Sequence, residues 1–130
     1  MSKRIAICDS SPATAAQLEG WLRQYCALYS AEPAILRFAT AQGFYEAADA
    51  CRFDALFFAQ DGPEGFLAVR GVRERARELP IVFITDTDSY AVHGFRLHLT
   101  DYIVRPVEFR HIVRAMRLLG VGDGGSYGGP

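Results

Sequence analysis

The chain has 130 residues, the size of a single domain, and half of them are hydrophobic, which is enough for a packed core and excludes disorder. Its 14 basic and 15 acidic residues give a net charge of −1, which argues against a domain that itself grips nucleic acid or an anionic membrane. The sequence starts without a secretory signal pattern, and no apolar run approaches the roughly 18 residues of a membrane span. Three cysteines without metal-ligand spacing suit a reducing compartment, so we expect a cytoplasmic protein with no membrane contact.

Short apolar runs alternate with amphipathic segments from one end of the chain to the other. The expected strands cover residues 5–8, 33–38, 54–59, 81–84 and 102–104, and the expected helices cover about 12–28, 40–51, 64–78, 88–97 and 109–119. Pro33 opens the second strand, which is typical of a sheet edge. Helix N-caps are available at Ser10 or Ser11, at Thr40, and at Asp88 or Ser89. Residues 1–119 form the predicted domain, and the Gly-rich segment 120–130 has the composition of a flexible linker.

This alternation predicts an α/β fold, a doubly wound parallel sheet of five βα units. The right-handed crossover rule makes 2-1-3-4-5 the expected strand order, as in flavodoxin-like proteins. Strands 5–8 and 54–59 then flank the switch point, so Asp9, Ser10 and Ala59 surround one crevice. Thr85 and Arg105 form its far wall.

The stretch from Asp54 to Pro63 is the central feature of the sequence. Its apolar run ends at Ala59, and a Gly-Pro turn follows, as at the carboxyl end of a buried parallel strand. In open α/β sheets the reactive residue is found at this point. Here it is an alanine, which carries no functional group.

Four landmarks at matching intervals resemble the receiver domain of bacterial response regulators, over about residues 3–119. They are the segments 5–9 (IAICD), 53–63 (FDALFFAQDGP), 83–85 (FIT) and 101–106 (DYIVRP). The run 90–95 (YAVHGF) followed by Asp101-Tyr102 is especially similar to receivers that precede LytTR-type DNA-binding domains. The resemblance implies the flavodoxin-like fold and a role in two-component signal transduction, with a DNA-binding output domain in the full-length protein.

Receivers hold Mg²⁺ with an acidic pair and accept a phosphoryl group on an aspartate, while a Ser/Thr and a lysine engage the phosphoryl oxygens and an aromatic residue completes the switch. The residues at these positions are Asp9 and Ser10 (acidic pair), Ala59 (acceptor), Thr85 (hydroxyl), Tyr102 (aromatic) and Arg105 (lysine). An alanine methyl cannot be phosphorylated. One remaining carboxylate is a poor Mg²⁺ site, so we expect no metal and no cofactor.

Asp61 is the alternative acceptor. The family places a proline four residues after the acceptor, and Pro63 points back to position 59. Asp61 then falls two residues later, where it could cap a loop, be solvated or, as the less favoured alternative, accept a phosphoryl group. Asp54 lies at the opposite end of the strand and is a surface or capping acid.

Arg105 has two interpretations, which the sequence leaves open. Its stem can pack on the sheet with its head in water. Alternatively, its guanidinium pairs with Asp9 and closes the crevice in one conformation. Cys8 abuts the same crevice, where burial and a neighbouring carboxylate favour a structural thiol over a redox role.

Receivers that resemble this chain often form homodimers through the region that corresponds to residues 88–119. The candidate contacts there are Arg96, Asp101 and Arg114. The expected function is therefore a phosphorylation-independent receiver, a regulatory and dimerisation module of a transcription regulator. The alternative is a domain that senses a small molecule or anion in the emptied crevice, with Arg105 and Thr85 as contacts. An enzyme ranks last, because no nucleophile-base pair or phosphate loop follows any strand.

Overall fold

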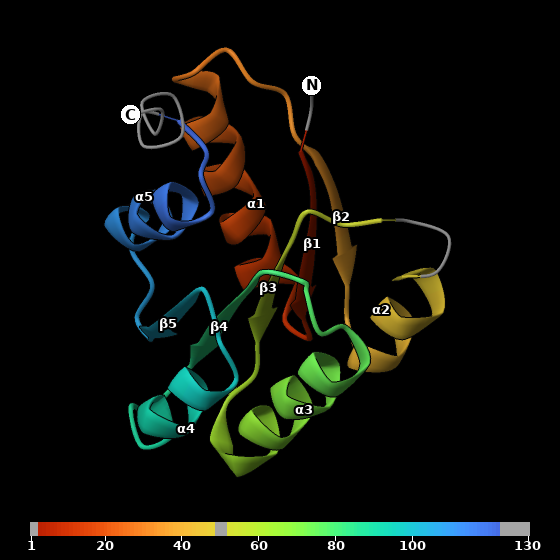
Figure 1. Cartoon of the computed structure of the whole chain (residues 1–130). Coiled ribbons are helices and arrows are strands. Elements are labelled where there is room, and N and C mark those ends of the chain that lie inside the picture. Colours follow the sequence, from red (N-terminus) through yellow and green to blue (C-terminus); the bar gives the residue numbers. More distant parts are fainter. Residues whose placement is uncertain (1–2, 49–51, 123–130) are drawn as a thin grey trace.

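The computed structural model describes residues 3–48 and 52–122, which form a five-stranded parallel sheet with helices on both faces (Figure 1). The strand order is β2-β1-β3-β4-β5, which confirms the predicted α/β fold. The elements are β1 (Arg4–Asp9), α1 (Pro12–Ala27), β2 (Ala34–Phe38), α2 (Ala41–Ala48), β3 (Ala55–Ala59), α3 (Gly62–Arg75), β4 (Ile81–Thr85), α4 (Ala91–Arg96), β5 (Asp101–Val104) and α5 (Phe109–Leu118).

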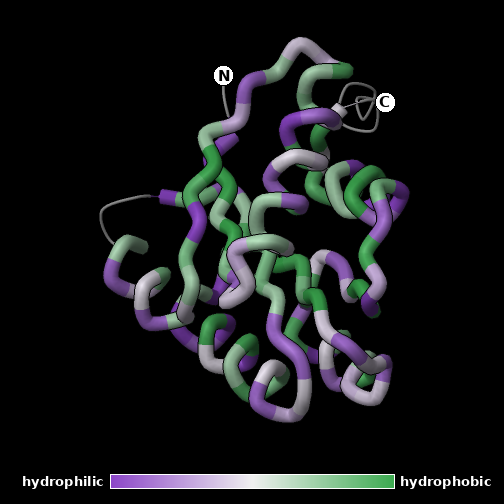
Figure 2. Tube along the Cα trace, turned by 180° about the vertical axis from the view of Figure 1, so that it is seen from behind, coloured by the Kyte–Doolittle hydropathy of each residue, from purple (hydrophilic) through white to green (hydrophobic). Residues whose placement is uncertain are grey.

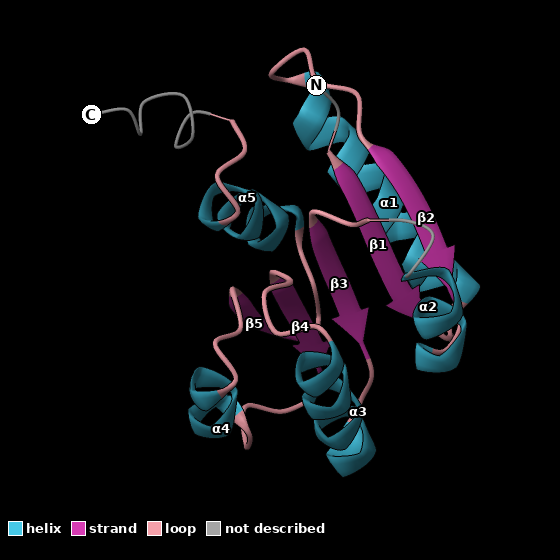
Figure 3. Ribbon diagram, turned by 45° about the vertical axis from the view of Figure 1, so that its right-hand side comes forward, coloured by secondary structure: helices cyan, strands magenta, loops and turns pink. Residues whose placement is uncertain are grey.

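The three central strands supply most of the core. Every residue of β3 and β4 is buried, and β1 is buried after its first residue, as expected for parallel strands covered on both faces. One half of the core lies between the sheet and helices α1 and α5, and the other half lies between the sheet and helices α2 and α3 (Figure 3). Hydrophobic stretches accordingly follow the strands, while hydrophilic stretches gather on outer turns and loops (Figure 2).

The structure corrects two of the predicted helix starts. Helix α3 begins at Gly62, two residues earlier than expected, because Asp61 is extended at the N-cap position and Pro63 is tolerated in the first turn. Helix α4 begins at Ala91 with Tyr90 at the N-cap, so the caps predicted at Asp88 or Ser89 are wrong. The carbonyl of Asp88 instead accepts the N–H of Ala91 in a preceding turn.

Two predicted caps are confirmed. The Ser11 hydroxyl accepts the N–H of Thr14, at 3.3 Å, and the Thr40 hydroxyl accepts the N–H of Gly43, at 3.0 Å. Both contacts use donors that the first turn of a helix leaves without backbone partners. The predicted end of the second helix near Cys51 falls on residues 49–51, which lie outside the described residues.

The packed chain continues past residue 119. The hydroxyl of Tyr25 on α1 donates to the carbonyl of Val121 at 2.7 Å, and the Val121 side chain packs against the core. Gly122 follows at φ 88° beside the rings of Tyr25 and Tyr29. Residues 123–130 lie outside the described residues, so the linker stays a prediction. Within the described ranges, no helix has the length and apolar character needed to cross a membrane.

Candidate functional site

The carboxyl ends of the strands bring the predicted crevice residues to one edge of the sheet. Asp9 is paired in register with Ala59 across β1 and β3, and Ala59 is paired with Ile84 on β4. Thr85, the last residue of β4, is paired with Val104 on β5, directly before Arg105. The topology therefore places the predicted crevice residues together at the carboxyl ends of the strands.

Ala59 contributes only a methyl group to this edge. It is 5% exposed and belongs to the hydrophobic core on the α1 side. Ser10, which follows Asp9, is exposed. An alanine and a serine have no carboxyl group, so neither position supplies a carboxylate. The described residues contain no group of three or more His, Cys, Asp or Glu side chains that could hold a metal ion.

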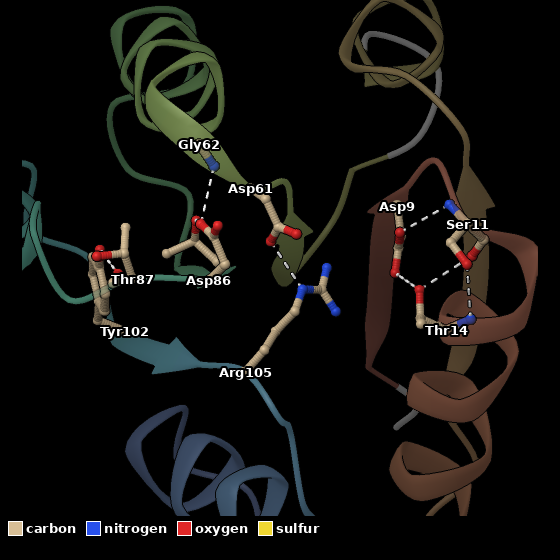
Figure 4. Close-up of polar contacts among 10 residues, drawn as sticks. Asp9, Ser11, Thr14, Asp61, Gly62, Asp86, Thr87, Tyr102 and Arg105 are labelled. Atoms are coloured by element: carbon tan, nitrogen blue, oxygen red, sulfur yellow. Dashed lines mark hydrogen bonds and ion pairs between the residues drawn. The ribbon is translucent and has the colours of Figure 1, made fainter.

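Asp9 is buried and both of its carboxylate oxygens have partners at the start of α1 (Figure 4). Oδ1 accepts the N–H of Ser11 at 3.0 Å, and Oδ2 accepts the hydroxyl of Thr14. A carboxylate at a helix N-terminus is stabilised by the orphan N–H groups and by the helix dipole. Asp9 therefore holds the β1–α1 turn through both of its carboxylate oxygens.

Arg105 pairs with Asp61, and the ion pair with Asp9, one of the two interpretations that the sequence left open, is wrong. Arg105 Nε lies 2.9 Å from Asp61 Oδ1, whereas within the described ranges no ion pair joins Arg105 to Asp9 (Figure 4). The side chains are 28% and 51% exposed, so the pair is only partly shielded from water. Asp61 is extended at the N-cap of α3 but makes no capping hydrogen bond with its side chain, which leaves its carboxylate free to reach across to Arg105.

Asp86 is a site residue that the sequence did not single out. Its Oδ1 accepts the N–H of Gly62 at 3.1 Å, which joins the loop after β4 to the first residue of α3. This hydrogen bond from Gly62 lowers the pKa of the Asp86 carboxyl below its usual range, and the Thr85 hydroxyl and Arg105 contribute in the same direction. The start of α3 is therefore held from both sides, by Arg105 through Asp61 and by Asp86 through Gly62.

Tyr102 at the aromatic position is held inward. Its hydroxyl donates to the carbonyl of Thr87 at 2.7 Å, and its ring packs edge-on against Phe83 with 5.4 Å between the ring centroids. Burial raises the pKa of its hydroxyl. The ring thus links β5 to the loop between β4 and α4.

Two of the three candidate dimer contacts pair with each other. Arg114 Nε lies 2.8 Å from Asp101 Oδ2 in the same chain, so these two side chains are partners of each other. Arg96 is exposed at the end of α4. Exposed apolar side chains lie beside it on the same helix, namely Val92 and Phe95.

Two hollows open near the site. One of about 290 Å³ lies over the ends of β1, β2 and β3, and the described residues that line it are all uncharged: Cys8, Ser10, Ala39, Thr40, Ala41, Ala59 and Gln60. Neither Arg105 nor Thr85 lines it. Burial and the charge of Asp9 raise the pKa of the Cys8 thiol to about 12, so this thiol is inert at neutral pH, in agreement with the structural role predicted for it. The second hollow lies on the α1 side and includes Arg105.

Searches with the sequence found neither a matching family model nor a matching curated protein. The structure, by contrast, is similar to many solved receiver domains. A CheY-like receiver domain protein from Methanospirillum hungatei has 18% identity and a TM-score of 0.73, covering 90% of this chain and 92% of that one. Chemotaxis protein CheY4 from Vibrio cholerae has 17% identity and a TM-score of 0.73, covering 92% and 99%.

The response regulatory domain of protein mrkE from Klebsiella pneumoniae is similar too. It has 24% identity and a TM-score of 0.70, covering 89% of this chain and 93% of that one. At these identities the similarity establishes the fold, and any activity has to be argued from the residues of the site. This chain has the fold of the CheY-like receiver domains of response regulators.

Proposed function

We propose that this chain is a receiver domain of a response regulator that works without aspartyl phosphorylation. The observation that carries the proposal is Ala59, a buried methyl group at the end of β3. Phosphorylation requires an oxygen nucleophile at this point and a metal beside it. Ala59 cannot attack phosphorus, Ser10 offers no carboxylate, and both oxygens of Asp9 are engaged by α1.

Asp61 is a poor substitute acceptor. Its carboxylate lies beyond the strand end, in the loop that starts α3, and it is paired with Arg105. In phosphorylation-dependent receivers the residue at position 105 is a lysine that meets the phosphoryl group. Here the corresponding cation already has a carboxylate partner. This pair supports a domain that keeps one arrangement of the β3–α3 loop without a phosphoryl group.

We further propose a regulatory role in the cytoplasm, not an enzymatic one, in a transcription regulator of the LytTR-associated type. The domain would act by homodimerisation through α4, β5 and α5, and a DNA-binding output domain would follow in the full-length protein. Exposed Val92 and Phe95 on α4 support an apolar contact on this face. The Asp101–Arg114 pair is satisfied within one chain, so these charges would border the contact.

The decisive experiment treats the purified chain with Mg²⁺ and acetyl phosphate and measures intact mass. The expected result is no added phosphoryl group. A matched positive control is the double variant Ser10→Asp, Ala59→Asp, which restores the two missing carboxylates. If the unaltered chain gains one phosphoryl group, the proposal fails, and Asp61→Asn then tests whether Asp61 is the acceptor.

Ligand sensing is the second candidate function, and the two hollows beside Ala59 and Arg105 favour it. The hollow over Ala59 has an uncharged lining, so it does not suit the anion that the sequence led us to expect there. The cation that an anion needs lies in the other hollow, on the α1 side.

A further inference from the structure

A narrow groove of about 200 Å³ separates α1 from the turn between β5 and α5. Its walls are mainly apolar and come from Leu18 and Trp21 on α1 and from Pro106 and Val107 on the turn. Trp21 is partly buried and is the chain's single tryptophan. A cavity of this size suits a ligand smaller than a drug molecule, with one flat or branched apolar body.

Three polar residues also line the groove, namely Thr14, Gln17 and Arg105. Arg105 uses only Nε for Asp61, and its two terminal nitrogens have no hydrogen-bond partner among the described residues. Figure 4 shows these nitrogens directed away from Asp61, toward the side that carries Asp9 and Thr14. A guanidinium with a free pair of N–H groups fits a carboxylate, which it can bind with two parallel hydrogen bonds.

The charges around the groove are consistent with an acidic ligand that competes with Asp61. No acidic side chain lines the groove among the described residues. Asp9 is the nearest acid on this side in Figure 4, and its two oxygens accept the Ser11 N–H and the Thr14 hydroxyl. Asp61 is the acid that forms an ion pair with Arg105, and the charge of Asp86 also acts on this guanidinium. A partly exposed ion pair of this kind is weak enough for a second carboxylate to compete with it.

We propose that this groove binds a small carboxylic acid with an apolar body, whose carboxylate contacts Arg105 and whose body lies against Trp21. The inference rests on the ligand-sensing candidate and gives it a place and a ligand class. The groove touches both polar contacts of the site, since Thr14 holds Asp9 and Arg105 holds Asp61. A carboxylate on Arg105 weakens the hold on Asp61, and through it the hold on the start of α3.

The test is a titration of the full chain with benzoate at neutral pH, in which the fluorescence emission of Trp21 is recorded at each benzoate concentration. Saturable quenching or a shift of the emission is expected, with a dissociation constant in the millimolar range for so small a probe. Benzamide has the same shape without the charge and is expected to bind at least about tenfold more weakly. No saturable change with benzoate, or equal binding of benzamide, overturns the proposal.

Three variants make the test specific. Arg105→Gln is expected to weaken benzoate binding at least about tenfold. Arg110→Gln removes an equal charge from an exposed site on α5 outside the groove and is expected to leave binding unchanged. Asp61→Asn removes the competing carboxylate and is expected to tighten binding. Unchanged binding by Arg105→Gln, or weaker binding by Asp61→Asn, contradicts the proposal.

These outcomes are separate from those of the phosphorylation test. Acetyl phosphate reports on an acceptor oxygen, whereas benzoate reports on Arg105 and the groove. A chain that is phosphorylated and binds benzoate disproves the main proposed function only. A chain that does neither disproves the ligand site only.

Discussion

Arg105 and Asp61 form an ion pair of 2.9 Å between β5 and the start of α3, two residues beyond the end of β3 at Ala59. The end of β3 therefore carries no carboxylate, and the loop that follows carries one. The cation after β5 reaches this loop carboxylate. The pair joins the loop after β5 to the loop after β3.

The Arg105–Asp61 pair is expected to contribute little to global stability. Both side chains are partly exposed, so water screens the attraction, and Asp61→Asn is expected to lower the free energy of unfolding by about 0.5 kcal/mol. Urea denaturation followed by circular dichroism measures this change. Arg110→Gln, which breaks the exposed Arg110–Glu108 pair at the start of α5, is the matched control. A loss of more than about 2 kcal/mol for Asp61→Asn would show that the pair acts as a structural bond.

Restoring the missing carboxylates is expected to create a Mg²⁺ site. The double variant Ser10→Asp, Ala59→Asp places acids beside Asp9 at the ends of β1 and β3. Without metal, the new carboxylate at buried position 59 lowers the melting temperature, because burying a charge is costly. Mg²⁺ is then expected to raise the melting temperature of the double variant, since it binds the native state. The unaltered chain serves as the control, and an equal rise there would contradict our account of the site.

Phe95 is expected to anchor the dimer. It is 85% exposed on α4, which is unusual for an aromatic side chain on a free surface. Phe95→Glu is expected to weaken self-association at least about tenfold in sedimentation equilibrium. Leu28→Glu alters an apolar residue of similar exposure, 66%, at the end of α1 and is expected to have no effect. A chain that is monomeric at all concentrations would disprove the dimer.

Substitution of Gly122 tests whether the packed domain extends beyond residue 119. Gly120 and Gly122 both have positive φ, so an alanine at either position costs about 1 kcal/mol in backbone strain. At Gly122 a Cβ would also lie 2.3 Å from the Tyr25 hydroxyl, whereas at Gly120 it would meet nothing within 4 Å. Gly122→Ala is therefore expected to destabilise the domain clearly more than Gly120→Ala in thermal unfolding. Equal losses would place Gly122 outside the packed body.

His111 is expected to make stability depend on pH. Its Nδ1 accepts the N–H of Glu108 at 2.9 Å at the start of α5, a contact that needs the neutral ring. Burial lowers the pKa of His111, and the charges of Arg110 and Arg114 add to the effect, while Glu108 and Asp101 oppose it. The unfolded chain therefore binds the proton more readily than the folded chain. This contribution is fully present above about pH 6.5 and is lost as the pH falls below that value.

Urea denaturation between about pH 7 and pH 5 measures this loss. His111→Gln is expected to flatten the pH dependence over this range, because the glutamine has no proton to take up. His93→Gln, on exposed α4, is the control and is expected to keep the dependence of the unaltered chain. If both variants keep it, another group is responsible.

The fold was predictable because each element carries its own signal. The predicted strands 54–59 and 81–84 correspond to β3 (Ala55–Ala59) and β4 (Ile81–Thr85), which are buried throughout. The proline at position 33 correctly indicated that β2 lies at the edge of the sheet. Helix starts were harder to predict. The cap at Ser11 was found because its hydroxyl reaches a local N–H, whereas at α4 a turn at Asp88 precedes the helix and moves its start to Ala91.

The site was predictable in position but not in its pairing. The alternation of strands and helices predicts a parallel sheet, in which the carboxyl ends of the strands lie on the same side. Asp9, Ala59 and Thr85 end their strands and therefore lie together. The partner of Arg105 depends on the direction of a long side chain and on the path of the loop after β3, which no local pattern encodes. The available signal was the acid at position 61, at the same edge as Arg105. The role of Asp86 depends likewise on the early start of α3 at Gly62.

Helix α1 connects the carboxyl ends of the strands, near Asp9, with the opposite end of the sheet, near Val121. Its first turn holds Asp9 through Thr14, and its last turn holds the carbonyl of Val121 through Tyr25. The helix has 16 residues, so it is a stiff strut of about 24 Å. A small tilt of the helix at its Thr14 end displaces its Tyr25 end, and with it the contact to the Val121 carbonyl. A contact at one end of α1 is therefore mechanically coupled to a contact at the other end, with no chemical change at Ala59.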